Sequence, residues 1–259
     1  MRDLRSKIFG FLAITLLSTA PAVAGIRVVS DIDDTAKITD VGDPLAMIVN
    51  GLFSKKAFTG MQEFYSSLAT ARGYSFDYVT GAVDLLRFRA TRFLRAGGFP
   101  AGELHTKPTF GGGHVREYKT RVIRALFDRY PDDRFILVGD DTQADFQVYD
   151  DLYRWFPDRI LAIYIRRVTN RQLPPSAYPF LTAFDLARTE YLMGRLQVKE
   201  AEPVALAILA EKKDRRIIPE FAYCPVGTFL VLDPQMEEWN DAIDARVRKI
   251  CVARKSDTE

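Results

Sequence analysis

The sequence contains little cysteine and little histidine, and neither sign of charge dominates. Of its 259 residues, two are cysteine and two are histidine, and the formal net charge is +2. A chain so close to neutral lacks the electrostatic footprint of a general nucleic-acid-binding protein, so we expect no nucleic-acid partner. Hydrophobic residues make up 47% of the chain and charged residues 27%, which excludes a disordered or fibrous protein.

Repeats, low-complexity tracts and Ser/Gly-rich linkers are also absent from the sequence. Their absence favours a single domain from residue 25 to residue 259. The two cysteines, Cys224 and Cys251, could form a disulfide that ties down the C-terminal segment if the chain reaches an oxidising compartment. Because the sequence does not give the distance between them, two buried thiols are an equal alternative.

The N-terminus carries a short hydrophobic run. A basic stretch ending at Lys7 precedes the apolar run Ile8 to Leu17, and Ala22-Val23-Ala24 precedes Gly25. This pattern predicts a signal peptide over residues 1–24 and export to the periplasm or the exterior, with membrane association left open. The run is about half of the ~20 residues that span a bilayer, so a retained anchor is the less favoured alternative.

Short apolar runs alternate with helical patterns along the rest of the chain. The expected strands are Ile26 to Ser30, Phe76 to Thr80, Phe135 to Gly139 and Ile160 to Ile165, with a further one at Thr228 to Leu232. The expected helices are Asp84 to Ala96, Val115 to Tyr130, Val204 to Leu209 and Glu237 to Val252. The apolar residues of the first four strands are continuous, as in strands covered on both faces. This order predicts an α/β fold with a doubly wound, Rossmann-like parallel sheet, whose ligands bind beyond the carboxyl ends of the strands.

Carboxylates are concentrated where the first expected strand ends, in Asp31-Ile32-Asp33-Asp34-Thr35. So dense a group is costly unless a cation compensates its charge, and Mg²⁺ prefers oxygen ligands of this kind. A solvated acidic turn that caps a helix is the ordinary alternative. An EF-hand loop is disfavoured, because its sixth position requires glycine and its twelfth glutamate, where this chain has Ala36 and Gly42.

A second expected strand, Phe135 to Gly139, also runs into carboxylates, at Asp140 and Asp145. Since parallel strands deliver their carboxyl ends to one edge of a sheet, we expect Asp31, Asp33 and Asp140 to converge around a metal ion.

Two further groups at this edge suit a phosphate ligand. Thr80 and Gly81 follow another expected strand and offer a hydroxyl donor and a close approach to the backbone. Lys119 lies early in the next expected helix and can reach the same edge as a positive charge. A structural threonine and a solvated helix lysine are the default interpretations of these residues taken singly.

Taken in this order, the four elements resemble the haloacid dehalogenase superfamily of aspartate-based phosphatases. The chain is more narrowly similar to the catalytic domain of the actin-patch phosphatidate phosphatases and their bacterial relatives, distant kin of lipins. That similarity rests on the following motifs: Ser30 to Asp40 (SDIDDTAKITD), Phe99-Pro100-Ala101-Gly102, Arg134 to Asp140 (RFILVGD), Tyr149, Phe156-Pro157 and Ile163-Tyr164-Ile165-Arg166. It implies a catalytic core at about residues 26–168, followed by a C-terminal extension at about 169–259.

The resemblance implies a role for each candidate residue. Asp31 would be the nucleophile that forms an aspartyl-phosphate, and Asp33 the general acid and base. Thr80, Gly81 and Lys119 would bind the phosphoryl group, with Thr80 and Lys119 stabilising its charge during transfer. Mg²⁺ would be held by Asp31, Asp140 and the backbone carbonyl of Asp33, while Asp145 orients a metal-bound water or holds Lys119. Asp34 and Asp141 are expected to be solvated neighbours or to support the metal ligands indirectly.

The substrate is predicted from weaker features. The intervals from Thr35 to Phe76 and from Thr80 to Lys119 span about forty residues each, too few for a full cap domain. An uncapped site suits a bulky or membrane-embedded phosphomonoester, and the resemblance implies phosphatidate or a related lipid phosphate. Soluble sugar or nucleotide phosphates, and a non-catalytic lipid-binding module, are the alternatives.

The segment Pro44 to Phe53, followed by Lys55 and Lys56, combines apolar and basic residues. It suits peripheral contact with an anionic membrane, and equally a helix that packs on the sheet. The oligomeric state is left open.

Overall fold

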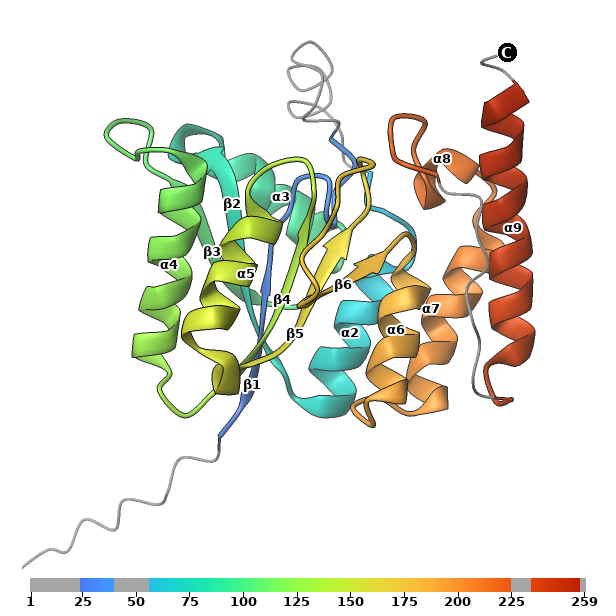
Figure 1. Cartoon of the computed structure of the whole chain (residues 1–259), viewed down its shortest axis with the longest axis horizontal. Coiled ribbons are helices and arrows are strands. Elements are labelled where there is room, and N and C mark those ends of the chain that lie inside the picture. Colours follow the sequence, from blue (N-terminus) through green and yellow to red (C-terminus); the bar gives the residue numbers. More distant parts are fainter. Residues whose placement is uncertain (1–23, 40–55, 225–233, 257–259) are drawn as a thin grey trace, which may run out of the picture.

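The computed structural model describes residues 24–39, 56–224 and 234–256 (Figure 1). Residues 1–23 of the expected signal peptide, the segment Pro44 to Phe53 and the strand expected at Thr228 to Leu232 lie outside these ranges.

A six-stranded sheet forms the centre of the molecule. Its strands are β1 (Ile26–Ser30), β2 (Ser75–Val83), β3 (Gly102–Lys107), β4 (Arg134–Asp140), β5 (Ile160–Arg166) and β6 (Ala177–Phe180). They run in the order β3-β2-β1-β4-β5-β6, and every neighbouring pair is parallel. This is the strand order of a doubly wound sheet, in which the switch point lies at β1 and β4. The predicted α/β fold with a Rossmann-like parallel sheet is therefore confirmed.

The central strands bury side chains on both faces, which explains their continuous apolar runs. Along β4, Phe135 and Leu137 belong to one buried cluster, whereas Ile136 and Val138 belong to the other. This alternation follows from the two-residue repeat of a strand, because successive side chains point to opposite faces. A sheet with two covered faces positions its carboxyl edge rigidly, and that edge carries the candidate site.

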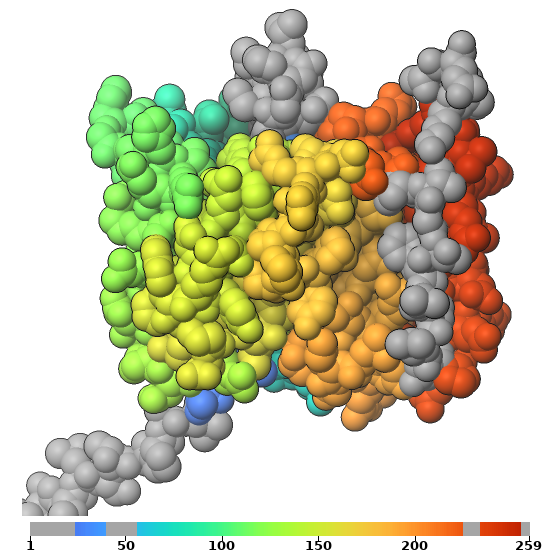
Figure 2. All heavy atoms as spheres, viewed as in Figure 1, coloured from blue at the N-terminus to red at the C-terminus, as the bar shows by residue number. Residues whose placement is uncertain are grey.

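Helices cover both faces of the sheet. They are α2 (Met61–Arg72), α3 (Arg87–Ala96), α4 (Val115–Arg129), α5 (Asp145–Trp155), α6 (Ala183–Leu192), α7 (Val198–Ala210), α8 (Asp214–Ile217) and α9 (Glu237–Ser256), with short 3₁₀ turns η1 (Asp84–Leu86) and η2 (Pro157–Arg159). Helices α4 and α5 pack on one face, while α2, α3, α6 and α7 belong to the cluster on the other, which α9 joins. In the space-filling view, the atoms of α4 and α5 lie toward the left and those of α6 toward the right, in agreement with the opposite faces that they cover (Figure 2).

The expected elements within the described ranges are confirmed, although the helix expected at Val204 to Leu209 is only the second half of α7. Strands β3 and β6 and helices α2, α5, α6 and α8 were not predicted. The helix expected at Val115 to Tyr130 is α4, and the one expected at Asp84 to Ala96 is divided into η1 and α3. Strands β3 and β6 lie at the two edges of the sheet. The sequence of β3, Gly-Glu-Leu-His-Thr-Lys, is mostly polar, as partly solvated edge strands allow. The sequence of β6, Ala-Tyr-Pro-Phe, is short and contains a proline, which edge strands tolerate.

None of the helices in the described part of the chain combines the length and hydrophobicity of a membrane span.

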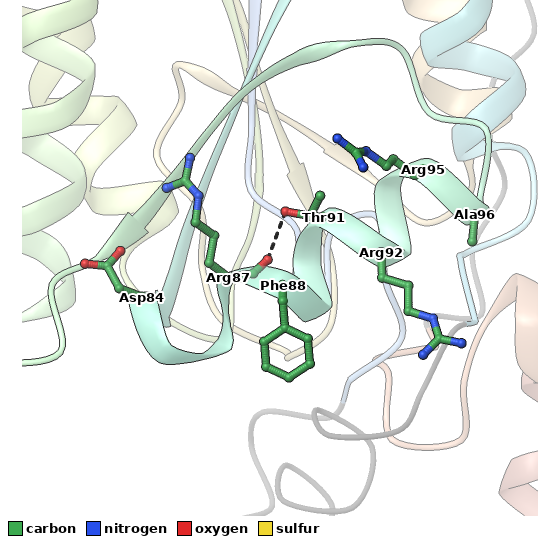
Figure 3. A pocket seen from close by; sticks show the side chains of 7 residues that line it. All are labelled: Asp84, Arg87, Phe88, Thr91, Arg92, Arg95 and Ala96. Carbon is green, nitrogen blue, oxygen red and sulfur yellow. Dashed lines mark hydrogen bonds between the residues drawn. The ribbon is translucent and has the colours of Figure 1, made fainter.

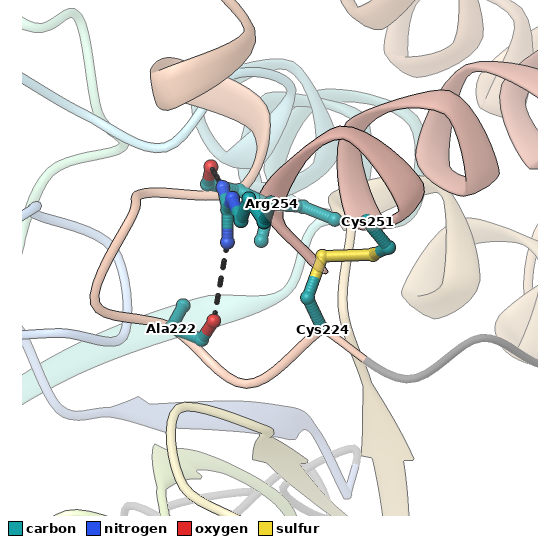
Figure 4. Close-up of a disulfide and its surroundings, with 5 residues drawn as sticks. Ala222, Cys224, Cys251 and Arg254 are labelled. Atoms are coloured by element: carbon teal, nitrogen blue, oxygen red, sulfur yellow. Dashed lines mark hydrogen bonds between the residues drawn. A yellow bond between two sulfur atoms is a disulfide. The ribbon is translucent and has the colours of Figure 1, made fainter. Parts of the chain in front are cut away.

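The two cysteines form a disulfide that joins α9 to the segment before it (Figure 4). The Cα atoms of Cys224 and Cys251 are 5.2 Å apart, and the bond closes a loop with a sequence separation of 27. Close by, the Arg254 guanidinium donates a hydrogen bond of 3.2 Å to the carbonyl oxygen of Ala222. Of the two pairing states that the sequence allowed, the structure shows the disulfide.

Reduction of this disulfide, or the substitution Cys224→Ser, should lower the free energy of unfolding by about 3–4 kcal/mol, because a loop of this length gains entropy in the unfolded chain. Urea titration with and without reductant measures the difference. The double variant Cys224→Ser/Cys251→Ser is the control, since its stability should not respond to reductant. Equal stability of the oxidised and reduced wild-type chains would contradict the prediction.

Candidate active site

Three buried carboxylates meet at the carboxyl edge of the sheet. Asp31 follows β1, Asp140 ends β4, and Asp145 begins α5. One carboxylate oxygen from each residue lies within 4.8 Å of the other two. The adjacency of β1 and β4 brings together residues that are more than a hundred positions apart, and the backbone N–H of Asp31 donates to the carbonyl of Val138 at 2.9 Å.

Lys119 contributes a positive charge to this group from the second turn of α4. Its Nζ donates to Asp31 Oδ1 at 2.7 Å and to Asp145 Oδ1 at 2.5 Å, and its side chain is 1% exposed. It is therefore not the solvated helix lysine of the default interpretation. Burial alone would lower the pKa of Lys119, but Asp145 and Asp31 outweigh it and raise the pKa above its ordinary value.

Among the described residues, Lys119 is the one cation that forms ion pairs with these carboxylates. Burial raises the pKa of Asp31 well above its ordinary value and that of Asp145 to about 6, although Lys119 opposes both shifts. Neighbouring carboxylates add to the increase, because like charges disfavour ionisation. These three carboxylates, of which Lys119 contacts two, could hold a metal ion whose charge would compensate them.

A second acidic group, on β2 and β3, shows the contrasting case. Asp77, Glu103 and His105 lie close enough to bind a metal. Here, however, Arg27 Nη1 contacts Asp77 at 2.8 Å and Arg129 Nη1 contacts Glu103 at 2.8 Å. Each carboxylate has its own guanidinium group, so this group needs no further cation.

Asp33 and Thr80 face each other beside the three buried carboxylates. Thr80 Oγ1 donates to Asp33 Oδ2 at 3.1 Å, and Thr39 Oγ1 donates to Asp33 Oδ1 at 2.9 Å. Lys37 Nζ lies 3.7 Å from Asp33 Oδ1. The Asp33 side chain is 22% exposed, against 4% for Asp31, so Asp33 lies nearer to solvent. The structure thus brings Asp33 and Thr80 together, and the Asp33 carboxylate is not among the three that lie within 4.8 Å of one another.

Gly81 lies where β2 passes the beginnings of two helical segments. A Cβ atom at this position would lie 3.1 Å from Val115 Cγ1 and 3.3 Å from Gln143 Oε1. Glycine therefore leaves this narrow space beside Thr80 open. The backbone N–H of Ala82 turns back to Thr80 Oγ1 at 3.0 Å, which fixes the orientation of that hydroxyl.

Hydroxyl groups hold Asp140 in place. Thr35 Oγ1 donates to Asp140 Oδ2 at 3.0 Å, and both the backbone N–H and the hydroxyl of Thr142 donate to Oδ1. These contacts orient the carboxylate toward Asp31 and Asp145. No role was predicted for Thr142. Its position directly after a strand end and an acidic pair could have indicated a contact with Asp140.

Asp34 and Asp141 are fully buried, so the part of the prediction that allowed them to be solvated is wrong. Asp34 Oδ1 accepts a hydrogen bond of 2.8 Å from the backbone N–H of Thr39, and Asp34 has the left-handed φ of 55°. Asp141 Oδ1 accepts hydrogen bonds of 2.8 Å from the backbone N–H groups of Val168 and Thr169. Both carboxylates therefore fix the loops around the site.

Arg166 holds the backbone of the loop that follows β1, and it was not predicted as a separate candidate. It ends β5, is 1% exposed, and lies over the rings of Phe58 and Phe180 at 3.7 and 4.5 Å. Its Nε donates to the carbonyl of Thr35 at 2.9 Å, and its Nη1 donates to that of Leu181 at 2.7 Å. Burial lowers the pKa of Arg166 to about 9. An arginine at the carboxyl end of an otherwise apolar strand was the signal that could have identified it.

Replacing Arg166 by methionine should lower the free energy of unfolding by about 2–4 kcal/mol, because two buried carbonyl groups lose their donors. Urea unfolding measures this change. The control is Arg116→Met, which removes an exposed ion pair with Asp151 and should cost less than about 1 kcal/mol. An Arg166→Met protein as stable as wild type would contradict this role.

Comparison with known proteins agrees with this architecture. The family model described as the catalytic domain of phosphatidate phosphatase APP1 matches residues 26–167. Phosphatidate phosphatase APP1 of Saccharomyces cerevisiae is 31% identical over 156 residues, which cover 56% of this chain and 26% of that protein. An uncharacterised protein of Schizosaccharomyces pombe is 24% identical over 160 residues, with the same coverage of 56% and 26%. The chain thus spans about a quarter of the length of these relatives.

Two solved structures also show some likeness. A chain of the Pnkp1/Rnl/Hen1 complex is 19% identical with a TM-score of 0.40, over 60% of this chain and 54% of that one. The class C acid phosphatase from Bacillus anthracis with tungstate bound is 13% identical with a TM-score of 0.38, over 71% and 79% of the two chains. Because the family model matches more than half of its length, the chain belongs to the family of phosphatidate phosphatase APP1 catalytic domains.

Proposed function

We propose that the protein is a Mg²⁺-dependent phosphomonoesterase that hydrolyses phosphatidate through an aspartyl-phosphate intermediate. The observation that carries this proposal is the buried set of Asp31, Asp140 and Asp145 around a single lysine. A divalent cation with a preference for oxygen ligands would compensate the remaining charge. Family membership supports a phosphatase, and the printed name of the yeast relative supports phosphatidate as the substrate.

Asp31 is the proposed nucleophile. A carboxylate oxygen of Asp31 attacks phosphorus in line, and the bond from phosphorus to the glycerol oxygen breaks. Lys119 holds Asp31 Oδ1 at 2.7 Å, which fixes the carboxylate in position for this attack. Lys119 in turn is anchored by Asp145, so the orientation of the nucleophile depends on a buried side chain of α5.

Asp33 is the proposed general acid and base. It gives its proton to the departing glycerol oxygen, which leaves as diacylglycerol. Asp33 then takes a proton from the water that attacks phosphorus, and breakage of the bond to Asp31 releases inorganic phosphate. Its position nearer to solvent suits both steps, because the leaving group and the water reach the site from outside.

The hydroxyl of Thr80, the space at Gly81 and the ammonium group of Lys119 are proposed to bind the transferring phosphoryl oxygens. Mg²⁺ held by Asp31, Asp140 and the backbone carbonyl of Asp33 would add positive charge that stabilises the phosphoryl group. Asp145 would orient a metal-bound water or, as its contact with Lys119 favours, hold that lysine.

Replacing the nucleophile should abolish turnover. We expect Asp31→Asn to reduce phosphate release from phosphatidate vesicles by at least about a thousandfold, and a chelator to have a similar effect on the wild type until Mg²⁺ is restored. Asp132→Asn, an exposed change of the same kind, is the control and should retain activity. Turnover that survives both the Asp31 change and the chelator would refute the mechanism.

A panel of soluble phosphomonoesters, assayed beside the vesicles, decides the substrate class. Faster turnover of phosphatidate supports the proposed substrate. A preference for sugar or nucleotide phosphates, with the same need for Asp31, would make the protein a soluble phosphomonoesterase. Binding to vesicles without turnover of any substrate would leave a non-catalytic lipid-binding module of the same family.

Export is part of the proposal. The hydrophobic run before Ala22-Val23-Ala24 supports it, as does the disulfide, because such bonds persist in oxidising compartments. The mature protein recovered from a periplasmic or culture fraction should therefore begin at Gly25. Intact-mass analysis tests this, and a protein that retains its first residues in the cytoplasm would contradict export.

A further inference from the structure

Three large apolar side chains protrude at the carboxyl edge of the sheet. Phe110 is 90% exposed, Leu85 72% and Phe88 63%, the highest values for large hydrophobic residues in the described ranges. The backbone N–H of Leu85 donates to Thr109 Oγ1 at 3.4 Å, which places the loop of Phe110 beside the turn of Leu85. Exposed apolar groups gathered at one place are typical of an interaction surface.

Arginines surround these apolar groups. Helix α3 contains four arginines and no acidic residue, and within the described part of the chain none of the four forms an ion pair. Arg92 and Arg95 follow Phe88 by one and two helical turns, and the side chains of Phe88 and Arg92 project from the same side of α3 (Figure 3). These side chains border a depression of about 850 Å³, whose one acidic lining residue, Asp84, accepts a hydrogen bond from Thr106.

This surface lies close to the candidate active site. Thr106 pairs in register with Thr80, and Arg87 Nη1 donates to Thr106 Oγ1 at 3.2 Å. Leu85 comes five residues after Thr80, a stretch of chain that spans at most about 18 Å. A molecular surface in contact with Leu85 and Phe88 would therefore lie beside the edge of the sheet that carries Thr80.

We propose that Leu85, Phe88, Phe110, Arg92 and Arg95 form a docking surface for an anionic lipid bilayer. The apolar side chains would enter the boundary between headgroups and acyl chains, and the two guanidinium groups would contact lipid phosphates. An anionic bilayer is favoured because protruding apolar groups here lie beside arginines that form no ion pair with any described residue. This positive charge is local, since the net charge of the whole chain is only +2. The catalytic benefit rests on the proposed substrate, since phosphatidate resides in such a bilayer.

Vesicle flotation tests the surface without requiring catalysis. The full chain is mixed with phosphatidylcholine vesicles, with or without phosphatidylglycerol, so that no phosphatidate is present. We expect binding only to the anionic vesicles, and at least about a tenfold loss of affinity in Leu85→Ser/Phe88→Ser and in Arg92→Glu/Arg95→Glu. Salt should weaken the binding, because exposed charges are screened.

Matched changes elsewhere provide the control. Leu206 is 51% exposed on α7, and Arg248 is exposed on α9, so Leu206→Ser/Arg248→Glu should bind as the wild type does. Turnover of a monomeric short-chain phosphatidate should be unchanged in both surface variants. If the wild type does not hydrolyse short-chain phosphatidate, the proposed function is refuted. If wild type and surface variants bind vesicles equally, the docking surface is refuted.

A label at the surface gives a second measurement that does not depend on the double variants. In Phe110→Cys the new thiol is available for labelling, because the two native cysteines are joined. An environment-sensitive fluorophore at this thiol should become brighter with anionic vesicles only. If the fluorescence is unchanged while the protein binds vesicles, the proposal is wrong. It is also wrong if light scattering shows that the wild type is a dimer and the surface variants are monomers, because this surface would then bind a second copy of the chain.

Discussion

The mutual repulsion of Asp31, Asp140 and Asp145 is the constraint on which the arrangement of the site depends. Carboxylates at this depth are destabilised both by lost hydration and by each other, which is why the pKa values of Asp31 and Asp145 are raised. Lys119 relieves part of this cost through contacts with two of them. The hydrophobic packing of the two sheet faces offsets the rest of this cost, and a bound cation would lower it.

The parallel sheet explains why so costly a group can be assembled. Strands β1 and β4 are neighbours at the switch point, and both point their carboxyl ends to the same edge. Their side chains are buried above and below, so the loops that follow begin from fixed positions. Arg166 connects the end of β5 to the site. It donates a hydrogen bond to the carbonyl of Thr35, and the hydroxyl of Thr35 donates one to Asp140.

The sequence was informative wherever a residue followed a continuous apolar run. Asp31, Thr80 and Asp140 each end or follow a buried strand, and the parallel arrangement makes their proximity predictable. Strand β3 was not predicted because it lies at an edge and has a single large apolar side chain, Leu104. The role of Arg166 could not be derived from spacing, because it depends on contacts with Phe58, Thr35 and Leu181, all distant from one another along the chain.

The carboxyl edge of the sheet carries buried charged groups and, close to them, exposed apolar groups. The carboxylates there are buried and repel one another. Leu85, Phe88 and Phe110, in the segments that follow β2 and β3, are exposed beside the arginines of α3. Neither arrangement stabilises the folded chain, because buried like charges repel and exposed apolar groups gain nothing from folding. The proposals account for both arrangements, because a bound cation would compensate the carboxylates and an anionic bilayer would cover the apolar groups beside the arginines. Under the proposed function, Mg²⁺ would bind between the carboxylates and the ester phosphate, and the bilayer that holds the ester would cover the exposed apolar groups.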